Sequence, residues 1–393
     1  MPAFAHHAPR RIVASTVRHQ THVVFPGSED SHQYAIADVM LDGPMVQDEA
    51  HAFLTDGGVL YMFPLPKGRV LVAADVASHH DGAAETPPLE EIQSLVAKRG
   101  PAGTRVSEPR WLSYFRIHYR LARHYRHGHR IFLAGDAVHV HSPVGGQGMN
   151  TGIQDAYNLG WKLALVARGF APPSLLETYE AERRAVAEDL VKWTRTITER
   201  SEAFAGMSHA LRERLYMNAV VPDAEARRIA RHSEELDLDY RRSAICAEHR
   251  PRGRASGLHA GMQALDAGPL QYGDRRLTLF DLLRGPRHAL LLFPGPRAGG
   301  AAWRRHAGLA ASLGRSHGEL IDVHVVGAPP ADLEGEVPIV LDPEGALHRR
   351  YGIRGESLYL IRPDGYVGYR SAPIAPRHLR AYLGRLFLSD GRA

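Results

Sequence analysis

The sequence contains a single cysteine, Cys246, and this scarcity excludes several classes of protein. One thiol cannot form an internal disulfide framework, a CxxC redox pair or a cysteine-based zinc site. No apolar run approaches the roughly 18 residues that a membrane-spanning helix needs, and the first residues lack the apolar core of a signal peptide. We therefore expect a cytoplasmic protein with no membrane partner.

Lysine is scarce as well, so arginine carries most of the net charge of +5. Basic residues alternate with Asp and Glu along the chain instead of forming blocks, which favours a solvated surface over a nucleic-acid interface. Histidines cluster between residues 118 and 141, but no second ligand pair with settled spacing accompanies them. We therefore expect neither a nucleic-acid partner nor a metal site.

The third absence is a nucleotide-binding motif. The turn G-x-G-x-x-G, which binds a dinucleotide pyrophosphate where a strand meets a helix, occurs nowhere in the 393 residues. A chain of this length nevertheless has room for two or three domains. Its 44% hydrophobic and 23% charged residues are ordinary values for a globular protein. Any nucleotide site must therefore use another motif.

A different glycine-rich segment lies near the middle of the chain. Residues 131–134 predict a buried strand, Asp136 follows at its carboxyl end, and the glycines between 145 and 152 open a helix. Such a turn directs backbone N–H groups and the positive end of a helix at an anionic or electron-rich ligand. Asp136 can accept hydrogen bonds from ligand hydroxyls. The pattern favours a nucleotide or a flavin, and the alternative is a glycine-rich turn that binds nothing.

The segment FLAGDAVHVHSPVGGQGMNTGIQDAYNLGWKLA, residues 132–164, resembles the second flavin-binding motif of the FAD-dependent aromatic hydroxylases of the p-hydroxybenzoate and phenol hydroxylase type. The resemblance implies that Asp136, in its pair with Gly135, holds the ribityl and pyrophosphate part of FAD. It also implies that the glycine turn lies against the pyrimidine side of the flavin ring. The residues expected to bind the cofactor there are Pro143, Gly145, Gly146, Gln147, Gly148, Met149 and Asn150.

A second motif of that family is matched only in part. Ser15, Val17 and Arg18 resemble its Asp-Gly-x-x-Ser-x-Val-Arg pattern, which implies a cofactor role for Arg18 as well. The Asp-Gly pair of the motif is replaced by residues 11–13, Arg-Ile-Val. Because the G-x-G-x-x-G turn is also missing, we expect an N-terminally truncated form of the family's flavin-binding domain.

Short strands predict a sheet before the central motif. Residues 34–43, 51–55, 59–65, 69–75 and 111–119 read as strands, and residues 88–98 as a helix. In the resembled family this sheet forms the roof of the substrate pocket. Alternation places Tyr61 and Phe63 on one face, and we expect them, together with His118, to line the pocket. Core packing is the alternative for each of them.

After the glycine turn the sequence predicts long helices and then a second domain. Residues 175–204 form a charged helical pattern, and its portion from Leu176 to Arg184 is expected to be a solvated face with i,i+4 ion pairs. A polar linker follows at 248–257. Beyond it we expect strands at 288–293, 321–326, 338–341, 357–361 and 366–369, and helices at 301–313 and 376–388. This order resembles the thioredoxin-like domain of the phenol hydroxylase branch.

The expected fold is therefore of mixed α/β and α+β class. We expect a remnant of the FAD-binding (Rossmann-like) domain at 1–24, a mixed substrate-binding sheet at 25–120, the FAD motif and helices at 121–247, and a thioredoxin-like domain without CxxC at 258–393. The last domain has no dithiol, so we expect it to be either structural or an interaction surface.

The resemblance also implies an activity, that of an FAD-dependent monooxygenase. NADPH or NADH would reduce FAD, and one atom of O₂ would enter an electron-rich phenolic or polyketide ring. No side chain is needed as a nucleophile, because the cofactor carries the chemistry, so no catalytic residue is assigned. A homodimer is conceivable. The alternative is a binding or structural protein that keeps the fold but no longer holds FAD.

Overall fold

The computed structural model describes residues 15–44, 48–76, 86–143, 146–205, 237–250, 257–330 and 338–388. The chain forms two compact units: unit 1 comprises residues 1–153 and 184–234, and unit 2 comprises residues 154–183 and 235–393. Helices α3 (Gly148–Ala167) and α4 (Glu177–Ala205) each contribute residues to both units. No helix among the described residues has the length and apolar character needed to cross a membrane.

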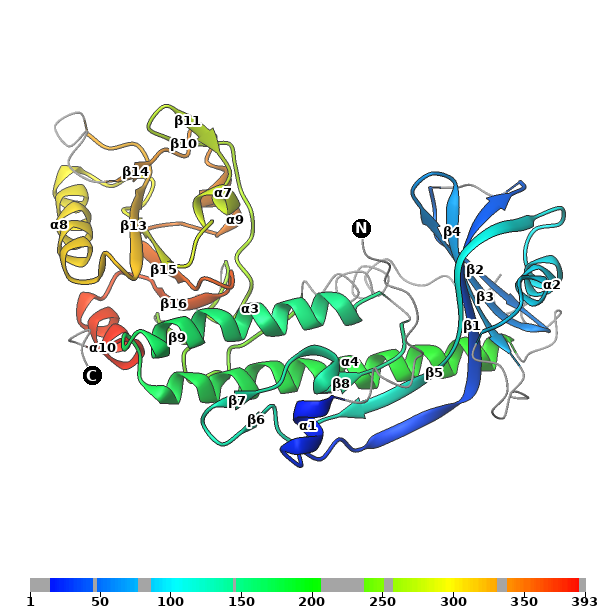
Figure 1. Cartoon of the computed structure of the whole chain (residues 1–393). Helices are drawn as coiled ribbons and strands as arrows, with labels where there is room; N and C mark the ends of the chain where they lie inside the picture. The colour runs from blue at the N-terminus through cyan, green and yellow to red at the C-terminus, as the bar shows by residue number, and fades with distance from the viewer. Residues whose placement is uncertain are drawn as a thin grey trace. The chain divides into compact units, whose positions relative to one another are not determined.

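Unit 1 is built on a six-stranded sheet whose paired strands are all antiparallel (Figure 1). The strand order is β2-β3-β4-β1-β5-β8. The strands are β1 (Gly27–Asp42), β2 (His51–Thr55), β3 (Gly58–Leu65), β4 (Arg69–Val76), β5 (Arg105–Leu121) and β8 (His139–Val140). The predicted strands are all present, and β1 and β5 are longer than expected.

Alternation along these strands gives the sheet one face that a helix covers and a second face, called the open face below, that is covered only in part. On the open face Tyr34, Ile117 and Tyr119 are buried together, with Val191 of α4 packed against them. Ala35, Ala37 and Val39 of β1 are fully buried on the covered face, because helix α2 (Leu89–Arg99) packs there through Ile92 and Val96. Side chains of opposite parity lie on the other face. The expected helix at 88–98 is therefore confirmed as the layer that covers one face of this sheet.

Short elements surround the cofactor motif in unit 1. They are α1 (Thr16–Gln20), β6 (Arg126–His127), β7 (Ile131–Phe132) and a 3₁₀ turn at Gly135–Ala137. The expectation of a buried strand at 131–134 was wrong in extent. β7 has two half-buried residues and pairs only with β6, because this hairpin lies outside the six-stranded sheet.

Unit 2 contains a second six-stranded sheet, of mixed direction and with the order β14-β13-β12-β15-β16-β9. β12 pairs in parallel with β13 and antiparallel with β15. The strands are β9 (Ala247–His249), β12 (His288–Phe293), β13 (Ile321–Val326), β14 (Ile339–Val340), β15 (Ser357–Ile361) and β16 (Val367–Ser371). The expected strands at 288–293, 321–326 and 357–361 have these very bounds.

Helices cover both faces of this sheet. On one face α8 (Gly300–His317) and α10 (Pro376–Leu386) share a core with Trp161 and Leu165 of α3. On the other face the hairpin β10 (Leu270–Tyr272) and β11 (Arg275–Leu277) and the short helices α7 (Leu279–Leu282) and α9 (Ala346–Arg350) contribute a second core. Unit 2 is thus a three-layer α/β structure that buries its sheet on both sides.

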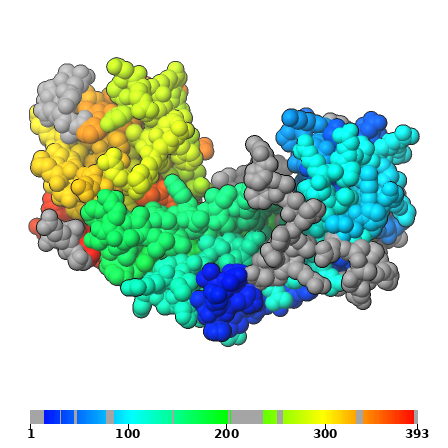
Figure 2. All heavy atoms as spheres, viewed as in Figure 1, coloured from blue at the N-terminus to red at the C-terminus, as the bar shows by residue number. Residues whose placement is uncertain are grey.

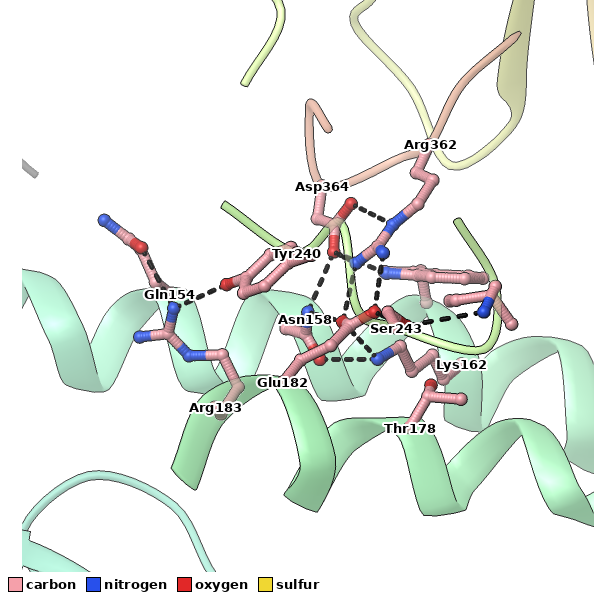
Figure 3. A network of polar contacts seen from close by, with 12 residues as sticks. Gln154, Asn158, Lys162, Thr178, Glu182, Arg183, Tyr240, Ser243, Arg362 and Asp364 are labelled. Carbon is pink, nitrogen blue, oxygen red and sulfur yellow. Dashed lines mark hydrogen bonds and ion pairs between the residues drawn. The ribbon is translucent and has the colours of Figure 1, made fainter. Parts of the chain in front are cut away.

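The charged run of α4 is not the solvated face that we expected. Glu182 is 3% exposed and Arg183 is fully buried. The carboxylate of Glu182 accepts hydrogen bonds from both terminal nitrogens of Arg362, at 2.7 and 2.9 Å, and from Nζ of Lys162 at 2.8 Å (Figure 3). Asp364 accepts a bond from Nε of Arg362 at 2.9 Å.

A second buried pair extends this network. Nε of Arg183 donates to Asp155 at 2.6 Å, and its Nη1 donates to the hydroxyl of Tyr240 at 2.7 Å. Asn158 donates to Glu182 at 2.7 Å. These contacts join α3 and α4 to the β15–β16 turn inside unit 2 (Figure 3). Buried charges of both signs therefore hold these elements together where a solvated surface was expected.

Candidate functional site

Two glycines of the cofactor motif have a backbone conformation that only glycine adopts easily. Gly135 has φ of +58° and Gly146 has φ of +68°, both in the left-handed region that L side chains disfavour. A Cβ built on Gly135 would lie 3.6 Å from Cα of Gly152, so the 3₁₀ turn passes close to the first turns of α3. These glycines let two backbone segments approach each other beside the expected cofactor.

Asp136 lies in this turn with its carboxylate available. Its side chain is exposed, and within the described residues it makes no hydrogen bond or ion pair. Partial burial raises the pKa of Asp136, and the neighbouring His139 opposes the rise. A carboxylate without an internal partner, next to a glycine turn, suits the hydroxyls of a ligand.

Arg18 is placed behind the same turn. The residue is 3% exposed. Its guanidinium lies over the ring of Phe25, 4.1 Å from the ring centroid, and donates to the backbone oxygen of Ala137 at 2.9 Å. Ser15 accepts a bond from the backbone N–H of Arg18 and caps α1. The hydrogen bond to Ala137 places Arg18 against the Gly-Asp turn, where it helps to fix the backbone of that turn in position.

The segment between Asp136 and the glycine turn is anchored on α4. The hydroxyl of Thr198 donates to Oγ of Ser142 at 2.8 Å, and both side chains are buried. His141 lies beside His139, with ring centroids 6.3 Å apart, and its Nδ1 donates to the backbone oxygen of Ser142. Burial lowers the pKa of His141 to about 4. This anchor could not be predicted from local sequence patterns, because Thr198 is 56 residues from Ser142.

The remaining predicted cofactor residues differ in exposure. Gly145 lies outside the described residues. Gln147 is buried, whereas Met149 is 76% exposed at the first turn of α3. Pro143, Gly146 and Asn150 are exposed, and Gly148 is half-buried. The amino end of α3 is thus accessible, and its free backbone N–H groups can bind a ligand.

The predicted pocket residues Tyr61 and Phe63 lie on the open face of the unit 1 sheet. Their rings are stacked with centroids 6.3 Å apart, and Phe63 is 41% exposed. The structure does not bring His118 to them. The strand pairings run from Tyr61 of β3 through Ala73 and Ile36 to Ser113 of β5. Odd-numbered residues of β5 therefore lie on this face. His118 is even-numbered and therefore lies on the opposite side.

An aromatic residue that the sequence analysis missed shares this face. Trp111 pairs with Asp38, which pairs with Leu71, which pairs with Phe63, so one row of side chains runs from β3 to β5. Trp111 is 46% exposed. Trp111 could have been predicted here, because it is two residues from Ser113 on the same strand and strand alternation puts both on one face. Aromatic rings thus flank the open face at both ends of the row.

Comparison with known proteins relates the glycine turn with Asp136 and the aromatic sheet face to a known family. Residues 13–194 match a family model described as an FAD binding domain. The chain is 34% identical to 6-methylpretetramide 4-monooxygenase of Streptomyces rimosus over 95% of its own length and 65% of that protein. It is 31% identical to pentachlorophenol 4-monooxygenase of Sphingobium chlorophenolicum, over 91% of its length and 64% of that protein.

Solved structures agree with these matches. BexE, studied for oxidation during BE-7585A biosynthesis, superposes with a TM-score of 0.64 at 31% identity, covering 95% of this chain and 67% of BexE. The anhydrotetracycline hydroxylase OxyS of Streptomyces rimosus gives a TM-score of 0.66 at 27% identity, with 95% and 67% covered. The chain belongs to the FAD-dependent aromatic hydroxylases. It spans about two thirds of the length of these relatives.

The residues present fit the family's cofactor, FAD. Asp136 offers ribityl hydroxyls an exposed carboxylate that has no partner in the described part of the chain, and the α3 amino end offers N–H donors. Gly146 has no atom within 4 Å of the position where a Cβ would stand, so a flat ring can approach its backbone. Asp136, Gly146, Gly148 and Asn150 are therefore the described residues best placed to hold it.

Proposed function

We propose that this chain acts in an FAD-dependent, NAD(P)H-using monooxygenase that hydroxylates a phenolic or polyketide aromatic compound. The observation that carries the proposal is the exposed carboxylate of Asp136, which has no hydrogen-bond partner among the described residues and lies in the turn beside the exposed amino end of α3. It is supported by relatives whose names are those of monooxygenases acting on a pretetramide and on pentachlorophenol. FAD, when bound, supplies the redox chemistry that activates O₂.

The residues of this chain would bind FAD and the aromatic substrate and orient them toward each other. Asp136 would accept hydrogen bonds from ribityl hydroxyls, and the N–H groups at the start of α3 would favour negative charge on the ring beside them. Tyr61 and Phe63 would stack against the aromatic substrate and keep water from it. His118 does not belong to this group. A homodimer remains a prediction, which sedimentation analysis would test.

The test is a titration of the full chain with FAD, followed by quenching of flavin fluorescence. In Asp136→Asn the acceptor for charged hydrogen bonds is lost, and we expect the Kd for FAD to rise about tenfold to a hundredfold. Asp274→Asn, which changes an exposed aspartate in the β10–β11 turn, is the matched control and should bind like the unaltered protein.

The outcomes separate the two interpretations. FAD binding by the unaltered chain, with a selective loss in Asp136→Asn and oxidation of NAD(P)H on addition of a phenol, would support the monooxygenase. An unaltered chain that binds no FAD at any concentration tested would contradict the proposal. That result would favour the alternative, a binding protein that keeps the fold without the cofactor.

A further inference from the structure

Two stretches of unit 1 contain basic residues and no acidic ones. Residues 109–135 include six arginines and four histidines without a single Asp or Glu, and residues 15–28 are also free of acids. The expectation that basic residues alternate with acids along the whole chain therefore does not hold here. The positive charges in such a segment repel one another unless an anionic ligand or an acidic side chain lies nearby.

The structure brings these two stretches together. The backbone N–H of Arg123 donates to the oxygen of Val24 at 3.0 Å, and that of Leu121 donates to Pro26 at 3.1 Å. The region 120–131, which we call the basic hairpin, continues through β6 and β7 and turns at Gly128, where φ is +60°. Helix α1, with its exposed His19, lies at the surface of unit 1 (Figure 2).

The basic side chains at the tip of the basic hairpin have no partner among the residues that the structure describes. Arg123, His127, His129 and Arg130 are exposed, and within the described part of the chain their side chains make no hydrogen bond or ion pair. Some other exposed arginines of unit 1 do have partners: for example, Arg195 lies 3.0 Å from Glu199. The two unpaired arginines Arg123 and Arg130 lie seven residues apart on the same basic hairpin.

The basic hairpin is joined to the cofactor motif. The backbone N–H of Ala122 donates to Val138 at 2.7 Å, and that of Leu133 donates to Tyr125 at 2.8 Å. Arg130 is six residues before Asp136, so their Cα atoms are at most about 20 Å apart. An extended dinucleotide can span such a distance between its phosphates and its reactive ring.

We propose that the basic hairpin binds the phosphate groups of the nicotinamide cosubstrate and selects NADPH over NADH. The inference rests on the proposed function, which requires such a reductant and for which no binding residue has been assigned. Guanidinium groups match phosphate oxygens in charge and geometry. The extra 2′-phosphate of NADPH is the group that an arginine can distinguish.

The exposure of these side chains favours the cosubstrate over FAD as the ligand. Ion pairs at an exposed site are individually weak and are screened by salt. Weak contacts suit a nucleotide that must bind and leave in every cycle, whereas a resident cofactor needs tighter binding. The acid-free composition also excludes a cationic partner for this surface.

The test compares the full chain with the double variant Arg123→Ala/Arg130→Ala by calorimetric titration with NADPH and with NADH, in the presence and absence of FAD. We expect the Kd for NADPH to rise roughly three- to thirtyfold in the variant, with a smaller change for NADH. The difference should disappear near 1 M salt, where charges are screened within about 3 Å. Arg305→Ala, an exposed arginine of α8, is the matched control.

Each other outcome overturns the inference. An unaltered protein that does not bind NADPH, or a variant that binds it equally well, would contradict it. A variant that loses FAD affinity but keeps NADPH affinity would assign the basic hairpin to FAD. Tighter binding of an oligonucleotide than of NADPH, lost in the variant, would assign it to nucleic acid. Because NADPH is also titrated without FAD, failure of the proposed function is recognised separately, by absent FAD binding in the unaltered chain.

Discussion

Single residues decide where charge can be buried in this protein. Arg362 is 2% exposed and forms two hydrogen bonds with Glu182 and one through Nε with Asp364. The anions beside it hold the pKa of Arg362 above its ordinary value, although burial alone would lower it. Removing one partner of such a group leaves an uncompensated buried charge, which costs more than the pair contributes.

We predict that Arg362→Met destabilises unit 2 by about 3–5 kcal/mol, because Glu182 and Asp364 would then lose their main counter-charge. Urea unfolding followed by tryptophan fluorescence measures the change, since Trp161 and Trp303 are both buried in unit 2. Arg305→Met, at an exposed site of α8, should change the unfolding free energy by less than about 0.5 kcal/mol. Equal stabilities of the two variants would show that the network does not stabilise the unit.

The residue pattern alone could not reveal this network. Glu182 and Arg183 stand in a run of charges that is typical of a solvated helix. Their partners Arg362 and Tyr240 lie 180 and 57 residues further along the chain. Short-range spacing carries no information about contacts of that separation, so the interpretation followed local propensity and was wrong.

At the scale of elements, sequence periodicity predicted the regular parts well. β12, β13 and β15 are buried apolar runs bounded by turn residues, and their bounds were predicted without error. The bounds of the strand expected at 131–134 were predicted incorrectly, because the length of this strand depends on the strand with which it pairs. β7 finds only the two-residue β6 to pair with. The glycine turn and Asp136 were recognisable locally, whereas the anchor of Ser142 on α4 was not.

Two glycines near the cofactor motif should respond to alanine in opposite ways. Gly160 is exposed in the interior of α3 with no atom within 4 Å of an added Cβ, so Gly160→Ala should stabilise the protein by up to about 1 kcal/mol. Gly135 has φ of +58°, so Gly135→Ala should destabilise it by about 1–2 kcal/mol. Thermal unfolding of the two variants side by side checks the signs. Stabilisation by Gly135→Ala would show that the turn does not require a left-handed residue.

At the scale of the whole molecule, the chain carries the central flavin motif of its family but spans about 65% of its curated relatives. Unit 1 contains the predicted FAD residues and the open aromatic face, and unit 2 contains the charged network. The three anions Asp155, Glu182 and Asp364 of the network oppose the three cations Lys162, Arg183 and Arg362. Unit 2 therefore depends on its buried carboxylates staying ionised.

This dependence predicts how stability changes in acid. Burial alone would raise the pKa of Glu182, but Arg362 and Lys162 hold it well below the ordinary value of 4.5. A carboxyl whose pKa is lowered in the folded state contributes stability that is complete above its unfolded pKa and is lost as the pH falls below it. The unfolding free energy of unit 2 should therefore decrease as the pH falls below about 4.5.

Substitution of Glu182 isolates its share of this effect. In Glu182→Gln the titrating carboxyl is gone, so the protein should be less stable at pH 7 by about 3–5 kcal/mol. It should also lose less stability than the unaltered chain between about pH 5 and about pH 3. Urea unfolding at a series of pH values measures both. Glu344→Gln, at an exposed position of the same unit, should keep the acid sensitivity of the unaltered chain. If Glu182→Gln kept it too, the acid response would have to come from other carboxyls, such as Asp342, whose pKa His348 lowers against the effect of burial.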